Sequence, residues 1–249
     1  MAKLSDLKVK LFTDGADKAQ ILEMAKQPWI AGFTTNPSLL KKAGVADYAA
    51  YARDLVAAVP DRHISFEVFS DDIPEMVAQA RVIASWGRNV FVKLPVTNTR
   101  GEALFEAVRA LSRDGVNINM TAIFTSEQVA RAVDALAGGA PACVSVFAGR
   151  LAALGIDYRP IMRDAVARAR KTQNVEIIWA STREAFNVLE ADEMGCHIIT
   201  APADILKKLP AIGSKSGAEL SLDAVKAFRA DAIAAGLTLE LAPRADAAE

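Results

Sequence analysis

A lysine, Lys93, lies inside an apolar and β-branched run, Val90–Val96, which predicts a buried strand. An ammonium group surrounded by apolar side chains loses hydration, and this loss favours the neutral amine, which can attack a carbonyl carbon. The residue therefore points to Schiff-base chemistry. The structural alternative is a lysine that reaches solvent from the end of its strand or pairs with a buried carboxylate.

A carboxylate that could make such a pair lies in another predicted strand. Strand alternation places Glu67 on the opposite face from Phe66 and Val68, where a lone carboxylate inside a barrel is costly. An ion pair between Glu67 and Lys93 would satisfy both charges without any catalysis, so it is the strongest structural alternative. That pair leaves unexplained the other polar side chains expected to point inward, which are Asn119, Thr121 and Ser145.

Short β-branched runs alternate along the chain with segments of helical apolar spacing, which is typical of repeated βα units. The predicted strands are Val9–Thr13, Gly32–Thr35, Ile64–Phe69, Val90–Pro95, Val116–Ile123, Cys143–Phe147, Val175–Ala180 and His197–Thr200. The predicted helices are Lys18–Lys26, Tyr48–Ala58, Glu75–Trp86, Gly101–Arg113, Glu127–Leu136, Ile161–Arg170, Arg183–Met194 and a surplus one from Leu222 to about Ala235. Capping signals at Asp72 and Thr125 support two of the helix starts.

Eight βα units in 249 residues predict an α/β fold, a single (β/α)8 TIM barrel with an additional C-terminal helix. We expect residues 1–236 to form the catalytic domain, including that helix, and residues 237–249 to be a flexible tail. A doubly wound open sheet is the alternative architecture. The chain has neither a Gly-x-Gly-x-x-Gly after its first strand nor a P-loop motif, so nothing in its sequence favours the nucleotide-binding versions of that sheet.

Composition limits the partners. Lys and Arg total 29 against 30 Asp and Glu, so no global field favours nucleic acid or an anionic membrane. The first residues lack an apolar signal region and no apolar stretch is long enough to span a bilayer, so we expect a cytoplasmic protein. Cys143 and Cys196 are isolated, and His63 and His197 are the only histidines, so we expect neither a disulfide framework nor a zinc cluster or other metal site.

Polar residues gather where the predicted strands end, and in a barrel these ends meet in one pocket. Asp14 and Asn36 could equally be turn or cap residues, and Ser181 fits a capping box at the start of a helix. A helix start with a hydroxyl and an arginine is also an anion site, so we expect Ser181 and Arg183 to bind phosphate, joined by Arg150.

Six motifs in order resemble the transaldolase family, including its fructose 6-phosphate aldolase branch, from about Lys10 to Leu209. In this chain they are Phe12–Asp17, Thr34–Ser38, Val92–Thr97, Asn119–Thr121, Ser145–Arg150 and Ala180–Arg183. The resemblance implies a cytoplasmic class I enzyme of carbohydrate metabolism, placed in the pentose phosphate pathway. It would act on sugar phosphates without a cofactor and assemble as a homo-oligomer through its C-terminal helix.

The resemblance also implies residue roles. Lys93 would form the Schiff base with the ketose C2 carbonyl, and Asp14 would take the proton of the C4 hydroxyl as the C3–C4 bond breaks. Glu67 and Thr121 would hold the water used in proton transfer. The residues expected to bind or surround the sugar and its phosphate are Thr34, Asn36, Asn119, Ser145, Phe147, Arg150, Ser181 and Arg183.

Two positions favour the transaldolase branch, because aldolases of the family typically carry glutamine at Glu67 and tyrosine at Phe147. The sequence therefore predicts transfer of a dihydroxyacetone unit from fructose 6-phosphate or sedoheptulose 7-phosphate to an aldose phosphate. The alternatives are an aldolase that releases free dihydroxyacetone and a non-catalytic sugar-phosphate binding barrel. One departure concerns Arg150: relatives usually carry an acidic residue shortly after it, whereas this chain reads Leu151–Leu154 without one.

Overall fold

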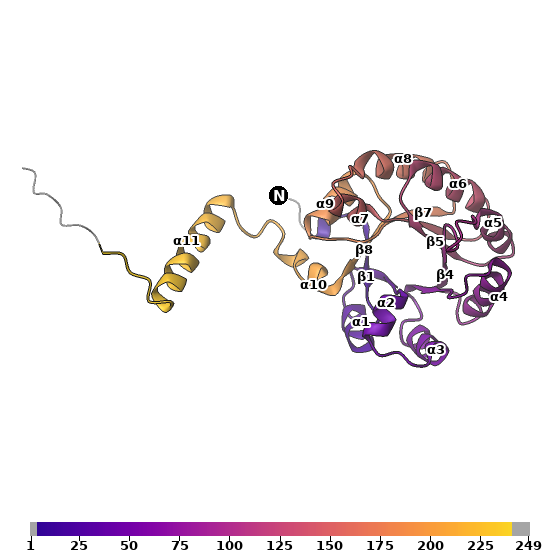
Figure 1. Cartoon of the computed structure of the whole chain (residues 1–249), viewed down its shortest axis with the longest axis horizontal. Helices are drawn as coiled ribbons and strands as arrows, with labels where there is room; N and C mark the ends of the chain where they lie inside the picture. Colours follow the sequence, from indigo (N-terminus) through magenta and orange to yellow (C-terminus); the bar gives the residue numbers. More distant parts are fainter. Residues whose placement is uncertain (1–3, 241–249) are drawn as a thin grey trace, which may run out of the picture. The chain divides into compact units, whose positions relative to one another are not determined.

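A computed structural model describes residues 4–240 of the chain. Eight parallel strands close into one barrel in sequence order, and β1 completes the ring by pairing with β8 (Figure 1). The strands are β1 Lys10–Asp14, β2 Ile30–Thr34, β3 His63–Glu67, β4 Val90–Pro95, β5 Ile118–Ile123, β6 Ala142–Val146, β7 Val175–Trp179 and β8 Ile198–Pro202. The predicted TIM barrel is confirmed, and the open sheet is excluded.

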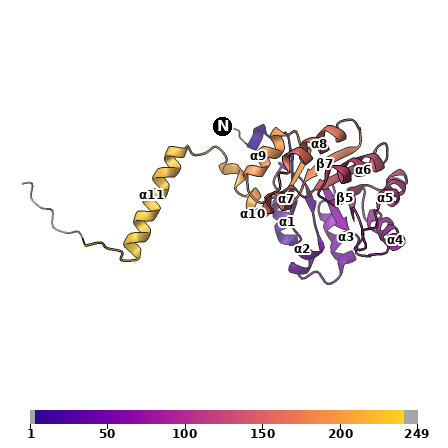
Figure 2. The ribbon, with the colours of Figure 1, turned by 45° about the horizontal axis from the view of Figure 1, so that its top comes forward.

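Helices surround the barrel on its outside, so both faces of most strands are buried (Figure 2). This explains why the strand sequences are apolar at consecutive positions. The helices of this part are α1 Lys18–Ala25, α2 Pro37–Lys42, α3 Tyr48–Ala58, α4 Ile73–Ala84, α5 Phe105–Arg113, α6 Ser126–Leu136, α7 Ala148–Ala153, α8 Arg159–Ala169, α9 Phe186–Glu193 and α10 Ala203–Leu206. Short 3-10 turns lie at Leu4–Asp6 and Leu209–Ala211.

The predicted helix starts at Asp72 and Thr125 are confirmed. The Asp72 side chain accepts a hydrogen bond from the Glu75 amide, and Thr125 forms a complete capping box with Gln128. The capping-box interpretation of Ser181 is wrong, because α9 begins only at Phe186 and Ser181 adopts a left-handed φ of 65°. The short helices α2 and α7 were not predicted, since six residues are too few to show a helical apolar period.

The barrel interior on the side away from the carboxyl ends of the strands is filled by apolar side chains that come from several strands. Phe12, Cys143, Ile178 and Ile198 form a buried cluster, and Phe91 packs against it. This packed layer closes the barrel below the carboxyl ends of the strands, so a cavity can form only above it.

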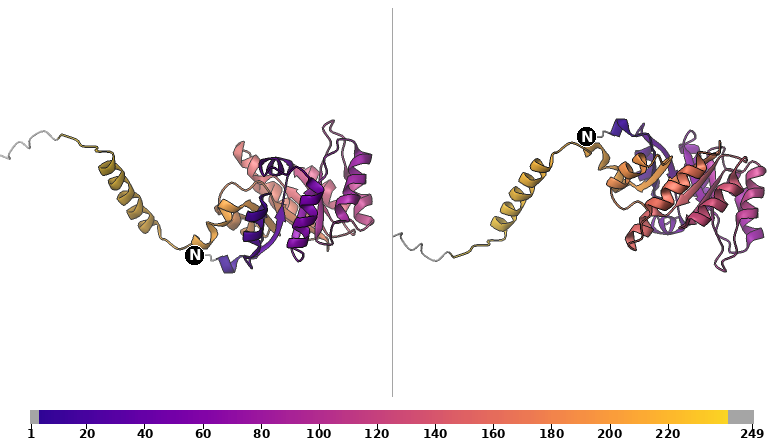
Figure 3. Two further views of the ribbon diagram at one scale, coloured as in Figure 1. Left: turned by 90° about the horizontal axis from the view of Figure 1, so that it is seen from below. Right: turned by 90° about the horizontal axis from the view of Figure 1, so that it is seen from above.

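The chain divides into two compact units, residues 5–209 and a second unit of residues 1–4 and 210–249. The described part of the second unit contains one continuous helix, α11 Gly217–Ala234 (Figure 3). This helix begins at a capping box made by Ser216 and Glu219. The predicted domain limits, 1–236 and 237–249, stay a prediction, and residues 241–249 of the expected tail lie outside the described residues. Within residues 4–240, no helix combines the length and apolarity needed to cross a bilayer.

Candidate active site

A cavity of about 510 Å³ opens at the carboxyl ends of the strands. All twelve site residues predicted from the sequence line it: Asp14, Thr34, Asn36, Glu67, Lys93, Asn119, Thr121, Ser145, Phe147, Arg150, Ser181 and Arg183. They come from the ends of seven different strands and the loops that follow. Thr200, on the eighth strand, lines the same cavity.

Lys93 is the most deeply placed charge in this cavity, with 7% of the residue exposed. Its Nζ donates a hydrogen bond of 2.7 Å to the Thr35 carbonyl oxygen and lies 3.2 Å from Oε2 of Glu67. Glu67 and Lys93 face each other at paired positions of β3 and β4, so the strand register itself creates the contact. The surroundings of the lysine are therefore less apolar than its own strand suggests.

Asp14 lies at the end of β1, on the side of the cavity opposite β5. Its Oδ1 accepts a 2.8 Å hydrogen bond from the Thr34 hydroxyl, which in turn lies 2.5 Å from the Thr200 hydroxyl. Burial raises the pKa of Asp14 above its ordinary value, although the nearby Lys93 charge and the Thr34 hydrogen bond oppose that effect. A carboxylate whose charged form is destabilised is a stronger base, which suits it to accept a proton.

Glu67 is held through its backbone as well as its charge. The Tyr48 hydroxyl accepts a hydrogen bond from the Glu67 amide and donates one to the Glu67 carbonyl, both at 2.9 Å. In the wall of the same cavity, the hydroxyl of Thr121 is buried without a hydrogen-bond partner among the described residues. A buried orphan hydroxyl that lines a cavity is suited to hold a water molecule or a substrate group.

The amide of Asn119 connects two other polar groups of the wall. Ser145 donates a 2.7 Å hydrogen bond to Oδ1 of Asn119, and Nδ2 of Asn119 donates a 3.0 Å bond to Ser65.

Asn36 is both a helix cap and a cavity residue, the two interpretations that its sequence position allowed. Its Oδ1 caps α2 by accepting a bond from the Leu39 amide, and the residue also lines the cavity.

Two arginines face the cavity from adjacent loops. The guanidinium carbon of Arg150, on α7, lies 4.9 Å from the centre of the Phe147 ring. An aromatic face therefore supports this arginine in a chain that lacks the acidic residue usual in relatives. Nε of Arg183 donates a 3.5 Å hydrogen bond to the Gly149 carbonyl. The two loops approach so closely that a Cβ at Gly149 would lie 1.6 Å from the Ser181 carbonyl oxygen. Only glycine fits there.

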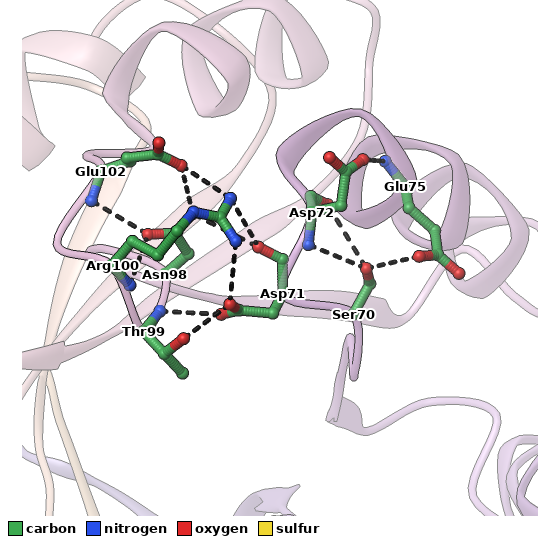
Figure 4. Close-up of polar contacts among 8 residues, drawn as sticks. All are labelled: Ser70, Asp71, Asp72, Glu75, Asn98, Thr99, Arg100 and Glu102. Atoms are coloured by element: carbon green, nitrogen blue, oxygen red, sulfur yellow. Dashed lines mark hydrogen bonds and ion pairs between the residues drawn. The ribbon is translucent and has the colours of Figure 1, made fainter.

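The loops that follow β3 and β4 are clasped together outside the cavity (Figure 4). The Asp71 carboxylate accepts hydrogen bonds from the Thr99 amide and hydroxyl, at 2.7 and 2.6 Å, and these bonds lower the pKa of Asp71. Buried Asn98 uses both oxygen lone pairs and both amide hydrogens in the same network with Arg100, Glu102 and the Asp71 carbonyl. The clasp restrains the two strand ends that carry Glu67 and Lys93.

Three residues of the site architecture were not predicted from the sequence: Thr200, Tyr48 and Ser65. Thr200 could have been found, because it is a polar residue at the end of the predicted strand His197–Thr200, although in the structure it is the third residue of β8. Tyr48 and Ser65 act through backbone or side-chain neighbours, so their own sequence context carries no signal. Among the described residues, no group of three His, Cys, Asp or Glu side chains could hold a metal ion.

Comparison with known proteins agrees with this geometry. The family profile named Transaldolase/Fructose-6-phosphate aldolase matches residues 11–242. The chain belongs to this family. The resemblance carried by the six sequence motifs is thereby confirmed, and the chain is an enzyme of the transaldolase family, whose members use a lysine Schiff base.

Relatives of this transaldolase family align with most of the chain. A protein named "Probable transaldolase" from Dehalococcoides mccartyi is 35% identical over 202 residues, which cover 81% of this chain and 90% of that protein. Another from Thermoanaerobacter sp. is 37% identical, with 81% and 89% covered, and "Probable transaldolase 1" from Listeria monocytogenes is 36% identical, with 81% and 90% covered. A solved structure of a provisionally named lyase/mutase from Burkholderia cenocepacia, with a TM-score of 0.55 at 14% identity over 93% of this chain and 86% of that chain, shares the fold alone.

The raised pKa of Asp14 makes stability depend on pH in a definite direction. The charged carboxylate costs folding free energy at any pH above the raised pKa, and this cost vanishes below the pKa that the residue has in the unfolded chain. We therefore expect Asp14→Asn to increase the free energy of unfolding at about pH 8, with a gain that shrinks toward about pH 4. Urea denaturation across this pH range measures the effect.

The matched control is Asp61→Asn, at an exposed carboxyl that keeps its hydration when the protein folds. It should leave the pH dependence unchanged. A loss of stability in Asp14→Asn that is equal at every pH would contradict the desolvation argument.

Proposed function

We propose that this transaldolase-family enzyme transfers a dihydroxyacetone unit from fructose 6-phosphate or sedoheptulose 7-phosphate to an aldose phosphate through a Schiff base on Lys93. The observation that carries the proposal is a deeply buried lysine amine 3.2 Å from the Glu67 carboxylate, in a cavity that also holds Asp14, whose pKa is raised by burial. The names of the three curated relatives support it.

The first chemical stage is imine formation. The amine of Lys93 attacks C2 of the ketose, and the resulting carbinolamine loses water to leave a cationic iminium. Proton transfers are needed both to free the amine and to expel the hydroxyl as water. Glu67, in contact with Nζ, and Thr121, with its unpaired hydroxyl, are placed to hold the water that carries these protons.

The second stage is carbon–carbon cleavage. Asp14 removes the proton of the C4 hydroxyl, the C3–C4 bond breaks, and its electron pair moves into the iminium to give an enamine. The C4 aldehyde leaves as an aldose phosphate. The enamine then attacks the aldehyde of an acceptor, Asp14 returns its proton to the new hydroxyl, and hydrolysis of the iminium releases the product.

The remaining cavity residues divide between the two ends of the substrate. Asn36, Asn119 and Ser145 bind the hydroxyls of the dihydroxyacetone unit, and Thr34 orients Asp14 through their hydrogen bond. Arg150, Ser181 and Arg183 bind the phosphate, with Phe147 supporting Arg150. The positive charge that binds the phosphate is confined to this part of the cavity, which agrees with a chain whose acidic and basic residues are nearly equal in number.

The helix α11 suggests a homo-oligomer. None of its residues is buried, and five large apolar side chains are each more than half exposed: Leu220, Leu222, Val225, Phe228 and Ile233. They cover a broad arc of the helix, which is typical of a helix surface that becomes buried against a partner. We propose that α11 packs on a second copy of the chain.

The cytoplasmic location of the protein also stays a proposal, and cell fractionation would test it.

Borohydride trapping tests the Schiff base directly. With fructose 6-phosphate present, reduction should fix a covalent adduct on Lys93, detected by mass spectrometry of peptides, because only an imine is reduced to a stable amine. Lys93→Met should abolish the adduct and the activity. Lys10→Met, a matched control at an ion-paired lysine of β1, should retain both. An adduct that persists in Lys93→Met would refute the proposal.

The same preparation separates the transferase from the alternative aldolase. Turnover of fructose 6-phosphate should require an acceptor such as erythrose 4-phosphate, since the enamine waits for an aldehyde. Rapid release of free dihydroxyacetone without acceptor would instead favour the aldolase. Binding of sugar phosphate with neither an adduct nor turnover would indicate a static Glu67–Lys93 pair.

The aromatic support of Arg150 gives a prediction on substrate affinity. Phe147→Leu removes a cation–π contact, so the KM for phosphorylated donors should rise about two- to fivefold while kcat changes little. Phe105→Leu is the matched control, because it removes the ring beneath Arg131, whose guanidinium carbon lies 4.2 Å from that ring's centre on the outside of the barrel. Steady-state kinetics should show no KM change in the control. Equal changes in both variants would contradict the role of Phe147.

The oligomer is tested by light scattering coupled to size-exclusion chromatography. Leu220→Ser combined with Phe228→Ser should shift the protein toward smaller species, because each substitution removes apolar area from the helix surface. Lys226→Ser and Arg229→Ser on the same helix form the control pair and should leave the assembly intact. A wild-type protein that elutes as a monomer would be the contrary result.

A further inference from the structure

A chain of hydrogen bonds leads from the barrel interior to the wall of the catalytic cavity. Nε2 of His63 lies 2.8 Å from the Ser65 hydroxyl, which accepts the 3.0 Å bond from Nδ2 of Asn119. Oδ1 of Asn119 accepts the 2.7 Å bond from Ser145, which lines the cavity. His63 therefore reaches Asn119 through Ser65, and it reaches Ser145 through Asn119, and both Asn119 and Ser145 line the cavity.

The surroundings of His63 keep its imidazole neutral. The ring stacks on Phe91 with 3.6 Å between centroids and meets the edge of Phe12 at 4.7 Å. Burial lowers the pKa of His63 to about 3, and the positive charge of Lys10 acts in the same direction. A neutral imidazole carries one hydrogen, so one ring nitrogen donates and the other accepts.

The hydrogen-bond geometry selects which nitrogen accepts. The Ser65 hydroxyl already accepts a hydrogen from Asn119, and its own hydrogen needs an acceptor. Nε2 of His63 is the acceptor within reach, so the imidazole carries its proton on Nδ1. Every donation then runs in one direction, from Ser145 to Asn119, to Ser65 and to His63.

The opposite tautomer would either leave the Ser65 hydrogen without an acceptor or reverse the whole chain. In the reversed chain, the hydrogen on Nε2 would point at Ser65, the Ser65 hydrogen would turn to Asn119, and the Asn119 amide would flip to donate to Ser145. The Ser145 hydroxyl would then point its hydrogen into the cavity. In the observed direction its hydrogen is used by Asn119, so its oxygen offers lone pairs to the substrate.

We propose that His63, as the neutral Nδ1–H tautomer, is a positioning residue that fixes the direction of this chain and makes Ser145 a hydrogen-bond acceptor for a substrate hydroxyl. Ser65 is the residue that transmits this direction. The tautomer and the direction of the chain follow from contacts alone, whereas the contact between Ser145 and the sugar rests on the proposed function.

Nitrogen NMR of protein labelled with ¹⁵N-histidine tests the tautomer. The chain has only two histidines, and the second provides an internal reference. Nδ1 of His197 accepts a 3.1 Å bond from the Ile177 amide, which leaves its hydrogen on Nε2. At pH 7 the spectrum should show two neutral imidazoles of opposite tautomer, assigned with His197→Asn. An Nε2–H or doubly protonated His63 would overturn the proposal.

Kinetics test the functional consequence. Ser65→Ala breaks the chain and frees the Asn119 amide, so KM for the ketose phosphate should rise about fivefold with kcat little changed. In an Asn119→Ala background the same substitution should change KM by less than about twofold, because the amide through which Ser65 acts on the cavity is gone. Ser112→Ala is the matched control. It deletes a buried hydroxyl in α5 that has no hydrogen-bond partner among the described residues and should leave KM unchanged.

An equal KM rise in both backgrounds would mean that Ser65 is only a packing residue, which refutes the positioning role. If the wild-type enzyme instead shows no turnover of sugar phosphates, the proposed function fails while the NMR result still decides the tautomer. The two failures are therefore distinguishable.

Discussion

The closed barrel forces its polar side chains to satisfy one another, and this constraint organises the whole site. A packed apolar layer of Phe12, Cys143, Ile178 and Ile198 closes the interior below the cavity. Charges above it can be compensated only by neighbours at matching strand positions, as Glu67 compensates Lys93. The Lys93 amine is therefore kept close to a carboxylate by the same register that holds the sheet together.

The same constraint gives the two carboxylates of the cavity, Glu67 and Asp14, different surroundings. Glu67 touches the lysine and is anchored by Tyr48, whereas Asp14 is held by hydroxyls on the far side of the cavity. Burial raises the pKa of Asp14, which favours proton uptake by this carboxylate. Two chemically similar groups acquire distinct surroundings from their positions alone.

Much of this arrangement could be predicted from the sequence, because alternating strands and helices leave few ways to close a barrel and place polar strand ends in one pocket. The twelve predicted residues do converge there, although their individual roles stay proposals. Ser181 shows where local patterns fail. Its sequence fits a capping box, but the close approach of Gly149 holds it in a left-handed conformation that no helix start requires. Tyr48, Ser65 and the clasp at Asp71 depend on contacts between distant segments, which a single sequence does not encode locally.

The double hydrogen bond of Tyr48 has a mechanical consequence. The residue pairing between β2 and β3 ends at Thr34 and Ser65. Two residues farther along β3, at Glu67, the Tyr48 hydroxyl makes the two hydrogen bonds that the backbone of a neighbouring strand would otherwise make. The chain after β2 is thereby free to diverge and carry Asn36 into the wall of the cavity. The strength of this seam therefore depends on one hydroxyl carried by α3, not on a ladder between two strands.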